Sequence, residues 1–364
     1  MQNKSWRTIR TLILAGGSLL GSTPGRAQTA ARSPNDRLAA LERELSRLAA
    51  AAGAVVGVAV EHLETGRKVS LNPDVRFHLA SAAKVPIAVH ILSMVDQGRL
   101  RLDSLIRLDT WDVYPRTYGP ISGYLRPGSA LTVHNLLELM LIISDNNATD
   151  ILLRLGGGPQ AVTERMRALG LSEIRIDRTS SVAIANWLGR ADISMENPIP
   201  PEEFGRLVAV ERSAAEISSL GASFARDPRD TATPAAMGSL LREIWKREVL
   251  SAASGTLLRD IMYRCQTGPG RLKGLLPPGT RVAHKTGTIG GSTNDVGVID
   301  LPGDAGHVVT VVLTKESTLP DGPGREVVMA QIGRAVHDYF TFARPSPSAA
   351  SSSPSRAKDP PTRQ

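Results

Sequence analysis

The chain has 364 residues, 41% hydrophobic and 21% charged, which is typical of a globular protein with one large domain or two small ones. Its formal net charge of +8 would suit a nucleic-acid-binding protein, but residues 1–27 contribute +4 and residues 344–364 contribute +3. The remaining +1 on residues 28–343 is too small for a basic footprint on the folded part, so we exclude nucleic acid as a partner.

The first 27 residues have the pattern of an export signal. Three basic residues precede a short apolar run at 11–21, and small residues at 25–27 offer a cleavage site. The run is too short to span a bilayer, and no later segment is long and apolar enough to do so, so no membrane anchor is expected. We therefore predict a signal peptide over 1–27 and a secreted or periplasmic protein.

Periodic apolar residues predict helices along most of the chain. Helical spacing occurs at 35–52, 132–142, 147–155, 160–169, 234–247, 255–265 and 325–341. Strands are expected at 55–60, 68–71, 281–285, 295–301 and 308–315. The late strands follow one another through short turns, so the sheet should be mostly antiparallel and built from both chain ends.

This order predicts an α/β (α+β) fold with two subdomains. The sheet subdomain would comprise residues 35–80 and 250–343, and an all-helical subdomain would comprise residues 81–249. Residues 344–364 are rich in Pro and Ser and are expected to be disordered.

Cys265 is the only cysteine, so no intramolecular disulfide can form. Its neighbours Arg264 and Gln266 are not general bases, and we interpret the thiol as a core residue rather than a nucleophile. No His, Asp and Cys residues have the spacing of metal ligands, so neither a metal nor a cofactor is expected.

Ser81 and Lys84 are three residues apart at the start of an apolar run, so on a helix they share a face. Pro86 is tolerated only near a helix start, which puts Ser81 at the N-terminus, where backbone N–H groups favour an oxyanion. A lysine buried against apolar residues can lose its proton and activate the serine. The alternative is an ordinary helix start with a solvated lysine.

Ser144-Asp145-Asn146 forms a second motif, in a predicted turn between two helices. Asp and Asn stabilise such turns, and Asn146 could cap the next helix, which is the purely structural interpretation. In the functional interpretation, Ser144 relays a proton and Asn146 holds a substrate amide.

Lys285-Thr286-Gly287-Thr288 forms a third motif, at the predicted end of a strand. The structural interpretation is a strand edge followed by a glycine-rich turn. In the functional interpretation, Lys285 and Thr286 meet a substrate carboxylate and Gly287 lets the substrate backbone approach. The Thr288 N–H would join the Ser81 N–H in an oxyanion hole.

Together and in this order, the three motifs resemble the Ser-x-x-Lys, Ser-Asp-Asn and Lys-Thr-Gly set of class A β-lactamases and penicillin-binding proteins. The resemblance covers about residues 35–343. It is nearest to the extended-spectrum, Bacteroidetes-type branch of class A, through the segment 267–277, His284 and the pair Asn294-Asp295.

The resemblance implies a β-lactamase/transpeptidase-like fold, with the site in a cleft between the subdomains. It implies that the protein opens β-lactam rings through an acyl-enzyme on Ser81, with Lys84 as base and Ser144 passing the proton to the leaving nitrogen. We expect a monomer that acts on a small-molecule β-lactam or a cell-wall peptide. The implied substrate-binding residues are Asn146, Lys285, Thr286, Gly287 and Thr288.

The chain departs from the class A pattern at the residue that should release the acyl group. In the family, a glutamate in an omega-shaped loop follows an Asp-Arg pair and activates water. Here Asp177-Arg178 is present, but Ser180 stands at the expected glutamate position, and a serine hydroxyl cannot take that proton at neutral pH. The loop is also several dozen residues longer than usual, with an insert at about 179–229.

Glutamates within the insert are candidates for the missing base. Glu196, in a Met-Glu-Asn-Pro segment, is the leading candidate, and Glu202 or Glu203 is the second. The alternative for all three is a solvated acid on a loop. The insert could equally cover and shape the pocket.

Three hypotheses of function follow from this departure. The first is a class A β-lactamase that deacylates normally. The second is a D-alanyl-D-alanine carboxypeptidase or penicillin-binding protein that acts on cell-wall stem peptides, which the missing glutamate favours. The third is a β-lactam-binding protein that deacylates slowly and serves as a sensor or scavenger.

Overall fold

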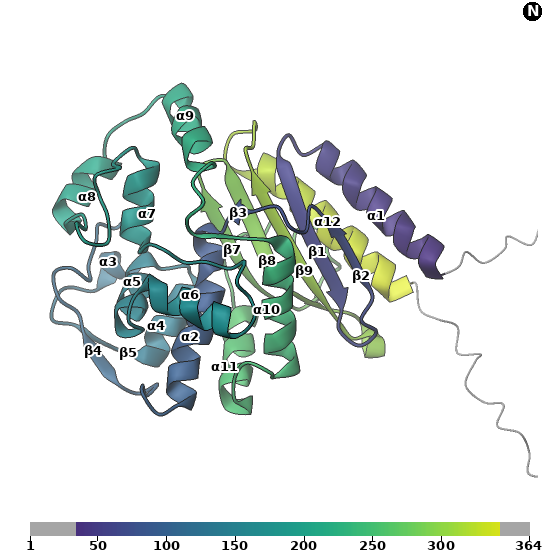
Figure 1. The fold of residues 1–364 in the computed structure, drawn as a ribbon, viewed down its shortest axis with the longest axis horizontal. Coiled ribbons are helices and arrows are strands. Elements are labelled where there is room, and N and C mark those ends of the chain that lie inside the picture. Colours follow the sequence, from purple (N-terminus) through teal and green to yellow (C-terminus); the bar gives the residue numbers. More distant parts are fainter. Residues whose placement is uncertain (1–33, 343–364) are drawn as a thin grey trace, which may run out of the picture. The chain divides into compact units, whose positions relative to one another are not determined.

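The computed structural model describes residues 34–342, and its framework is a five-stranded antiparallel sheet with helices on both faces (Figure 1). The strands, in spatial order, are β2 (Lys68–Leu71), β1 (Val55–His62), β9 (His307–Lys315), β8 (Ser292–Asp300) and β7 (Val282–Ile289). Both ends of the described chain contribute strands, as the sequence predicts. The predicted signal peptide and Pro/Ser-rich tail lie outside the described residues.

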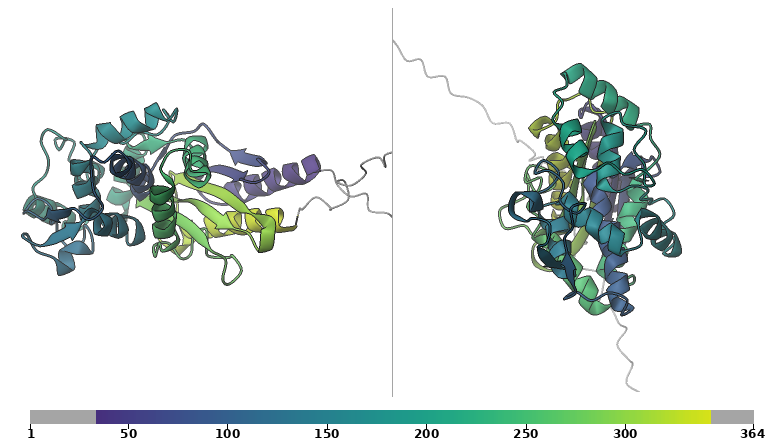
Figure 2. Two further views of the ribbon diagram at one scale, coloured as in Figure 1. Left: turned by 90° about the horizontal axis from the view of Figure 1, so that it is seen from below. Right: turned by 90° about the vertical axis from the view of Figure 1, so that its left-hand side faces the viewer.

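Two layers of helix bury the central strands on both faces. Helices α10 (Pro234–Lys246) and α11 (Ala252–Tyr263) pack on one face, while α1 (Pro34–Ala50) and α12 (Pro323–Phe342) pack on the other (Figure 2). Strand β9 is accordingly an almost continuous run of Val, Thr and Leu, which is the pattern expected when neither face meets water.

The helical part of the fold is organised around α2 (Lys84–Asp96), which is buried on all sides from Lys84 to Ser93. A helix that is apolar all round belongs in a core, and α2 packs against several other helices. These neighbours are α4 (Val133–Ile142), α5 (Asn146–Leu155), α6 (Pro159–Ala168) and α11.

Several short elements complete the described chain. They are the strand pair β3 (Phe77–His78) and β6 (Thr231–Ala232), the pair β4 (Leu105–Arg107) and β5 (Ala130–Thr132), helix α3 (Ile121–Tyr124), and the 3-10 turns η1 (Ala80–Ala83) and η2 (Gly303–Ala305). The segment 99–130, for which the sequence predicts no helix or strand, therefore contains β4, α3 and the first residue of β5.

The insert at 179–229 contains three helices that the sequence analysis does not anticipate. They are α7 (Ser180–Trp187), α8 (Pro201–Val208) and α9 (Ala214–Phe224). Each has a start signal, because Thr179 and Ser213 cap α7 and α9 and Pro201 opens α8. Insert residues such as Phe204 form an apolar cluster with Tyr114 and Tyr118, so the insert packs against the segment that carries these two tyrosines.

A buried ion pair ties the two ends of the insert together. The Arg178 side chain is 2% exposed, and its Nε donates to Asp230 Oδ2 at 2.5 Å. Its Nη1 donates to Asp227 Oδ2 at 2.9 Å. The backbone N–H groups of Asp177 and Arg178 also donate to Asp230 Oδ1. These ion pairs and hydrogen bonds therefore hold the first and last residues of the insert next to each other.

Replacing Arg178 by alanine is expected to lower the free energy of unfolding by about 3–5 kcal/mol, because it leaves a buried carboxylate without its counter-charge. Arg206→Ala is the matched control, since Arg206 forms an exposed ion pair with Glu202 within the same insert. That change should cost less than about 0.5 kcal/mol. Denaturant unfolding of both variants checks the prediction, and equal losses would contradict the role given to Arg178.

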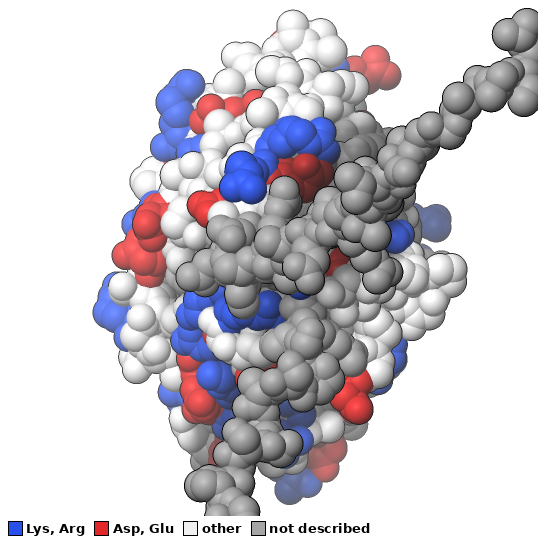
Figure 3. Space-filling view, turned by 90° about the vertical axis from the view of Figure 1, so that its right-hand side faces the viewer, with Lys and Arg blue, Asp and Glu red and all other residues white. Residues whose placement is uncertain are grey.

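Charges of both signs are interspersed on the face shown in Figure 3, where Lys and Arg side chains alternate with Asp and Glu side chains. This mixture agrees with the near-neutral balance of residues 28–343 in the sequence. Among the described helices, none is both long enough and apolar enough to cross a membrane.

Candidate active site

Ser81 lies in the 3-10 turn η1, and α2 begins directly after it at Lys84. Pro86 occupies the first turn of α2, as its missing N–H requires. Lys84 Nζ donates to Ser81 Oγ at 3.1 Å. The serine and the lysine therefore meet at the N-terminal end of a buried helix, in the arrangement that their spacing predicts.

The Lys84 Nζ is surrounded by oxygen atoms, and within the described part of the chain it forms no ion pair with a carboxylate. Besides Ser81, its Nζ donates to Ser144 O at 2.8 Å, to Ser144 Oγ at 3.0 Å and to Asn146 Oδ1 at 2.7 Å. Burial, and then the positive charge of Lys285, hold the pKa of Lys84 well below its usual range. A lysine in this setting can lose its proton and accept one from a serine hydroxyl.

Ser144 joins the two lysines of the site. Its Oγ accepts from Lys84 Nζ and from Lys285 Nζ, each at 3.0 Å. Its φ of 61° is uncommon for a residue other than glycine, and such backbone is kept where surrounding contacts fix it. Asp145, not Asn146, caps α5, because Asp145 Oδ1 accepts from the Ala148 N–H at 2.8 Å. The left-handed backbone of Ser144 thus places its hydroxyl between the amines of Lys84 and Lys285.

The Lys-Thr-Gly motif lies inside β7 rather than at its end, because β7 continues to Ile289. The structure adds a packing reason for the glycine at position 287. A Cβ at Gly287 would lie 2.4 Å from the carbonyl oxygen of Leu79 and 3.0 Å from the backbone nitrogen of Ala82. The missing side chain therefore lets β7 lie against η1, which brings the strand up to the Ser81 turn.

Lys285 is fully buried, and its Nζ donates to Ser144 Oγ and, at 2.9 Å, to the backbone oxygen of Thr286. Burial lowers the pKa of Lys285 to about 8. Next to it, Thr286 Oγ1 lies 2.5 Å from Thr267 Oγ1, and Arg271 Nη2 donates to Thr288 Oγ1 at 2.7 Å. This end of the site is rich in cations and hydroxyl groups, which suits an anionic group of a substrate.

We predict that kcat/KM for a carboxylate-bearing substrate falls as the pH rises through about 8. Below that pH Lys285 carries the positive charge that attracts the carboxylate, and above it the charge is lost. In Lys285→Arg the fall should move to higher pH, because a guanidinium keeps its proton. A pH profile of both proteins checks this, and an unchanged fall in Lys285→Arg would assign it to another group.

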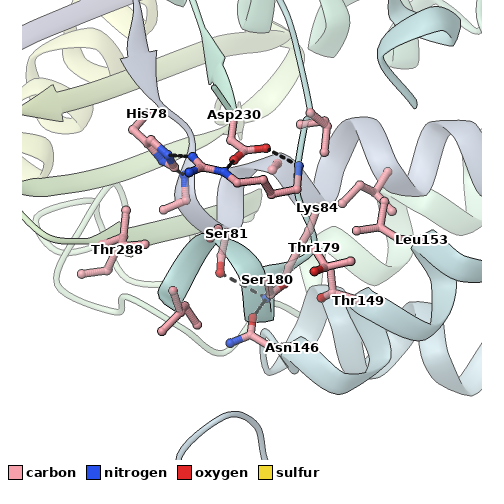
Figure 4. Close-up of a pocket in the computed structure, with 18 residues that line it drawn as sticks. His78, Ser81, Lys84, Asn146, Thr149, Leu153, Thr179, Ser180, Asp230 and Thr288 are labelled. Carbon is pink, nitrogen blue, oxygen red and sulfur yellow. Dashed lines mark hydrogen bonds and ion pairs between the residues drawn. The ribbon is translucent and has the colours of Figure 1, made fainter. Parts of the chain in front are cut away.

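A cavity of about 100 Å³ opens beside these groups. Ser81, Lys84, Asn146 and Thr288 line it, together with Ser180 at the start of α7 (Figure 4). The predicted nucleophile, its lysine and the predicted amide-binding residue therefore face one space, although they come from η1, α2 and α5.

A model of the β-lactamase enzyme family matches residues 40–340. The chain belongs to this family. It is 29% identical to β-lactamase VEB-1 of Pseudomonas aeruginosa over 82% of this chain and 90% of that protein. It is 28% identical to the extended-spectrum β-lactamase PER-1 of the same species, over 90% of this chain and 94% of that protein.

The solved structure of an ancestral Gram-negative (GNCA) class A β-lactamase is similar throughout. It shares 34% sequence identity and a TM-score of 0.66, and the match covers 82% of this chain and 99% of that one. The predicted fold class, the class A family and the serine hydrolase activity on β-lactams are thus confirmed.

The glutamates of the insert lie away from the β-lactamase cavity. Glu196 is exposed and accepts a hydrogen bond from Ser194 Oγ at 2.9 Å. Glu202 pairs with Arg206, and Glu203 pairs with Arg190. None of the three lines the cavity, so the structure does not bring the predicted base, Glu196, to Ser81.

Among the described residues that line the cavity, Asp230 is the one acidic residue, and its carboxylate is held by Arg178. Ser180, at the position expected for the glutamate, does line the cavity. The local geometry therefore presents a hydroxyl where a class A enzyme is expected to present a carboxylate.

Asp150, a carboxylate next to the site, is not predicted from the sequence. Its oxygens accept from the N–H of Ser180 at 2.8 Å, from the N–H of Ser181 at 3.2 Å and from the Tyr118 hydroxyl. Burial raises the pKa of Asp150. Asp150 lies four residues after Asn146 and therefore on the same face of α5, and this spacing could have placed it next to the site. Asp150 fixes the start of α7 and does not line the cavity.

Proposed function

We propose that Ser81 is the acylated nucleophile of this β-lactamase and that neutral Lys84 is its base. Lys84 takes the Ser81 proton, Ser81 Oγ attacks the β-lactam carbonyl carbon, and the ring C–N bond breaks. The proton passes from Lys84 through Ser144 Oγ to the leaving nitrogen. The supporting observation is that one buried Nζ lies within 3.1 Å of both hydroxyl oxygens.

Each remaining substrate-binding residue receives a role in the same proposal. Asn146, whose Oδ1 accepts from Lys84 and whose Nδ2 donates to Tyr118 O at 2.9 Å, binds the amide of the acyl side chain. Lys285 and Thr286 bind the carboxylate. The N–H groups of Ser81 and Thr288 polarise the carbonyl oxygen during attack.

We further propose that Lys84 also activates the water that releases the acyl group. After acylation its amine is again neutral, and among the described residues no glutamate lines the cavity to compete for this role. A single base that serves both steps is expected to deacylate more slowly than a dedicated carboxylate, because Lys84 is placed to take the Ser81 proton and not the proton of a water on the acyl-enzyme.

Ser180→Glu tests this account of deacylation. Ser180 lines the cavity beside Ser81, so a carboxylate at this position could take a proton from the attacking water. We expect the acyl-enzyme to decay faster by roughly tenfold or more, within the range of general-base catalysis. Ser181→Glu is the control, since Ser181 is buried and does not line the cavity. Equal decay in Ser180→Glu and the unchanged protein would contradict the proposal.

The finer assignment to the extended-spectrum branch is supported by similarity to VEB-1 and PER-1 and by the shape of the site. A groove of about 1170 Å³ shares Thr288 and Ile289 with the cavity, and residues of α7, α8 and α9 line much of it. Apolar side chains such as Trp187 and Phe204 face it. We propose that this groove accepts the bulky acyl side chains of extended-spectrum substrates.

A D-alanyl-D-alanine carboxypeptidase is the second candidate function, and the hydroxyl of Ser180 in place of a carboxylate favours it. Such an enzyme would use the same Ser81, Lys84 and Lys285 on a peptide carboxylate. Release of D-alanine from a cell-wall stem peptide, compared with hydrolysis of a cephalosporin by the same preparation, decides between the two.

We also propose that the enzyme is exported through the signal over 1–27 and acts as a monomer. Residues 28–343 would then form the mature catalytic domain, with the Pro/Ser-rich residues 344–364 as a tail. Intact mass of the protein recovered from the culture medium or periplasm would test the cleavage before Gln28.

A further inference from the structure

Cys265 lies two residues after the end of α11. It is 5% exposed, and its Sγ lies 3.3 Å from Thr267 Oγ1. None of the proposed catalytic steps uses this thiol. A buried cysteine is usually inert, and it becomes reactive only where neighbouring groups stabilise the thiolate.

His284 is such a neighbouring group. Its ring is completely buried on β7, next to Lys285 in sequence, and its Nδ1 lies 2.8 Å from Asp295 Oδ1 on β8. Its other nitrogen, Nε2, has no hydrogen-bond partner within the described residues. His284 and Thr286 are two residues apart on β7, so their side chains lie on the same face of the sheet. Thr267 contacts both Thr286 and Cys265, so the thiol lies on the side of β7 that carries the buried imidazole.

The charges of this group favour a thiolate. Burial opposes a charge on His284, but the carboxylate of Asp295 outweighs it and raises the pKa of the imidazole to about 9. Burial would raise the pKa of the Cys265 thiol, but His284 and then Lys285 outweigh it and lower this pKa to about 6. In this group Cys265 would be the nucleophile, His284 the base and Asp295 the residue that orients the base.

The thiol is also close to the residues proposed to bind the substrate carboxylate. Thr267 Oγ1, which contacts Cys265 Sγ, lies 2.5 Å from Thr286 Oγ1. One threonine therefore separates the sulfur from the Lys-Thr-Gly motif. A group added to the sulfur must displace Thr267, and with it Thr286, because the surrounding interior leaves little free space.

We propose that Cys265 is a modification site, an oxidisable thiolate paired with His284, and that its oxidation by a hydroperoxide weakens binding of the substrate carboxylate. This inference rests on the proposed role of Lys285 and Thr286.

The chemical step balances with the groups in place. The Cys265 thiolate attacks one oxygen of hydrogen peroxide, so an S–O bond forms and the O–O bond breaks. Sulfur is oxidised by two electrons to sulfenic acid, and the peroxide is reduced. The leaving hydroxide takes the proton of the His284 imidazolium and departs as water.

The test uses the full-length protein, in which Cys265 is the only cysteine, so every thiol signal reports on one residue. Hydrogen peroxide is added, and intact mass with and without dimedone follows the sulfenic acid. KM for a cephalosporin is measured before treatment, after treatment and after dithiothreitol. We expect one dimedone adduct and a roughly tenfold rise in KM, the loss of about one hydrogen bond to a charged group, reversed by dithiothreitol.

Cys265→Ser is the first control, and its KM should be the same before and after peroxide. His284→Asn is the second, and its thiol should react with peroxide roughly tenfold more slowly, because the proton donor and the counter-charge are gone. The proposal is overturned if the native thiol stays unmodified while the urea-unfolded thiol is oxidised. It is also overturned if the thiol is oxidised and KM does not change.

These outcomes are separable from failure of the proposed function. Acylation of Ser81 and the KM of the untreated protein are measured first in the same preparation. If the untreated protein forms no Ser81 adduct, the proposed mechanism fails, and the site can still be judged from the native and unfolded oxidation rates.

Discussion

Replacing Ser81 by alanine is expected to abolish covalent labelling of the protein by any β-lactam. Ser81 Oγ is the hydroxyl that lines the cavity at the N-terminal end of α2 while accepting a hydrogen bond from Lys84. Without it, the β-lactam carbonyl has no nucleophile beside a base. Hydrolysis should fall by at least about 10³-fold, the scale seen when a nucleophile is removed from a serine hydrolase.

Ser180→Ala is the matched control for that change. Ser180 also presents a side chain to the cavity, but among the described contacts Lys84 Nζ donates to Ser81 and Ser144 and not to the Ser180 hydroxyl. This variant should still be acylated at a similar rate. A β-lactam adduct that forms on Ser81→Ala, or one that is lost in Ser180→Ala, would contradict the assignment of the nucleophile.

Replacing Lys84 by methionine is expected to reduce the rate of acylation by roughly 10²–10⁴-fold, the usual contribution of a general base. Methionine fills a similar volume in the buried helix but cannot accept the Ser81 proton or pass it to Ser144. The loss should appear in kcat/KM and in the rate of adduct formation measured by stopped-flow or rapid-quench mass spectrometry.

Lys84→Arg separates the base from the charge. Arginine keeps a positive charge at this position, but it cannot lose its proton. If Lys84 acts as a neutral base, the arginine variant should be as slow as the methionine variant. Acylation by Lys84→Arg at more than a tenth of the original rate would mean that the charge matters and that another group takes the proton.

Sequence alone predicted the parts of the site that depend on local spacing. Ser81 and Lys84 are one helical turn apart, so any helix start there brings them together. Thr132 caps α4 through a reciprocal hydrogen-bond pair with Asn135, and such local signals also placed the helix before the Ser144 turn. The predicted pairing of strands from both chain ends followed from apolar patterning in the same way.

Features that depend on contacts between distant segments escaped prediction. Nothing in the sequence indicated that Gly287 packs against the Leu79 carbonyl, more than two hundred residues earlier; its predicted role of admitting substrate stays a prediction. The prediction of Cys265 as a core residue is confirmed by its 5% exposure, but its link through Thr267 to the Lys-Thr-Gly strand could not be read from its neighbours in sequence. Packing of α11 on β7 and of β7 on η1 creates both relationships, and no local pattern encodes them.

The prediction for Glu196 shows a further limit of sequence reasoning. A glutamate near a proline and an asparagine matched the family pattern in composition, but not in position relative to Arg178. The insert folds into three helices with an apolar cluster, and this packing leaves Glu196 exposed. A missing catalytic carboxylate is therefore not replaced by the nearest glutamate in sequence unless the fold turns that side chain inward.

The measurement that tests the account most directly is intact-protein mass after mixing with a chromogenic cephalosporin, with hydrolysis followed in the same sample. The account predicts an adduct on Ser81 that forms quickly and decays at the rate of steady-state turnover, because deacylation by Lys84 limits the cycle. Turnover with no Ser81 adduct on any timescale, or an adduct on another residue, would contradict it.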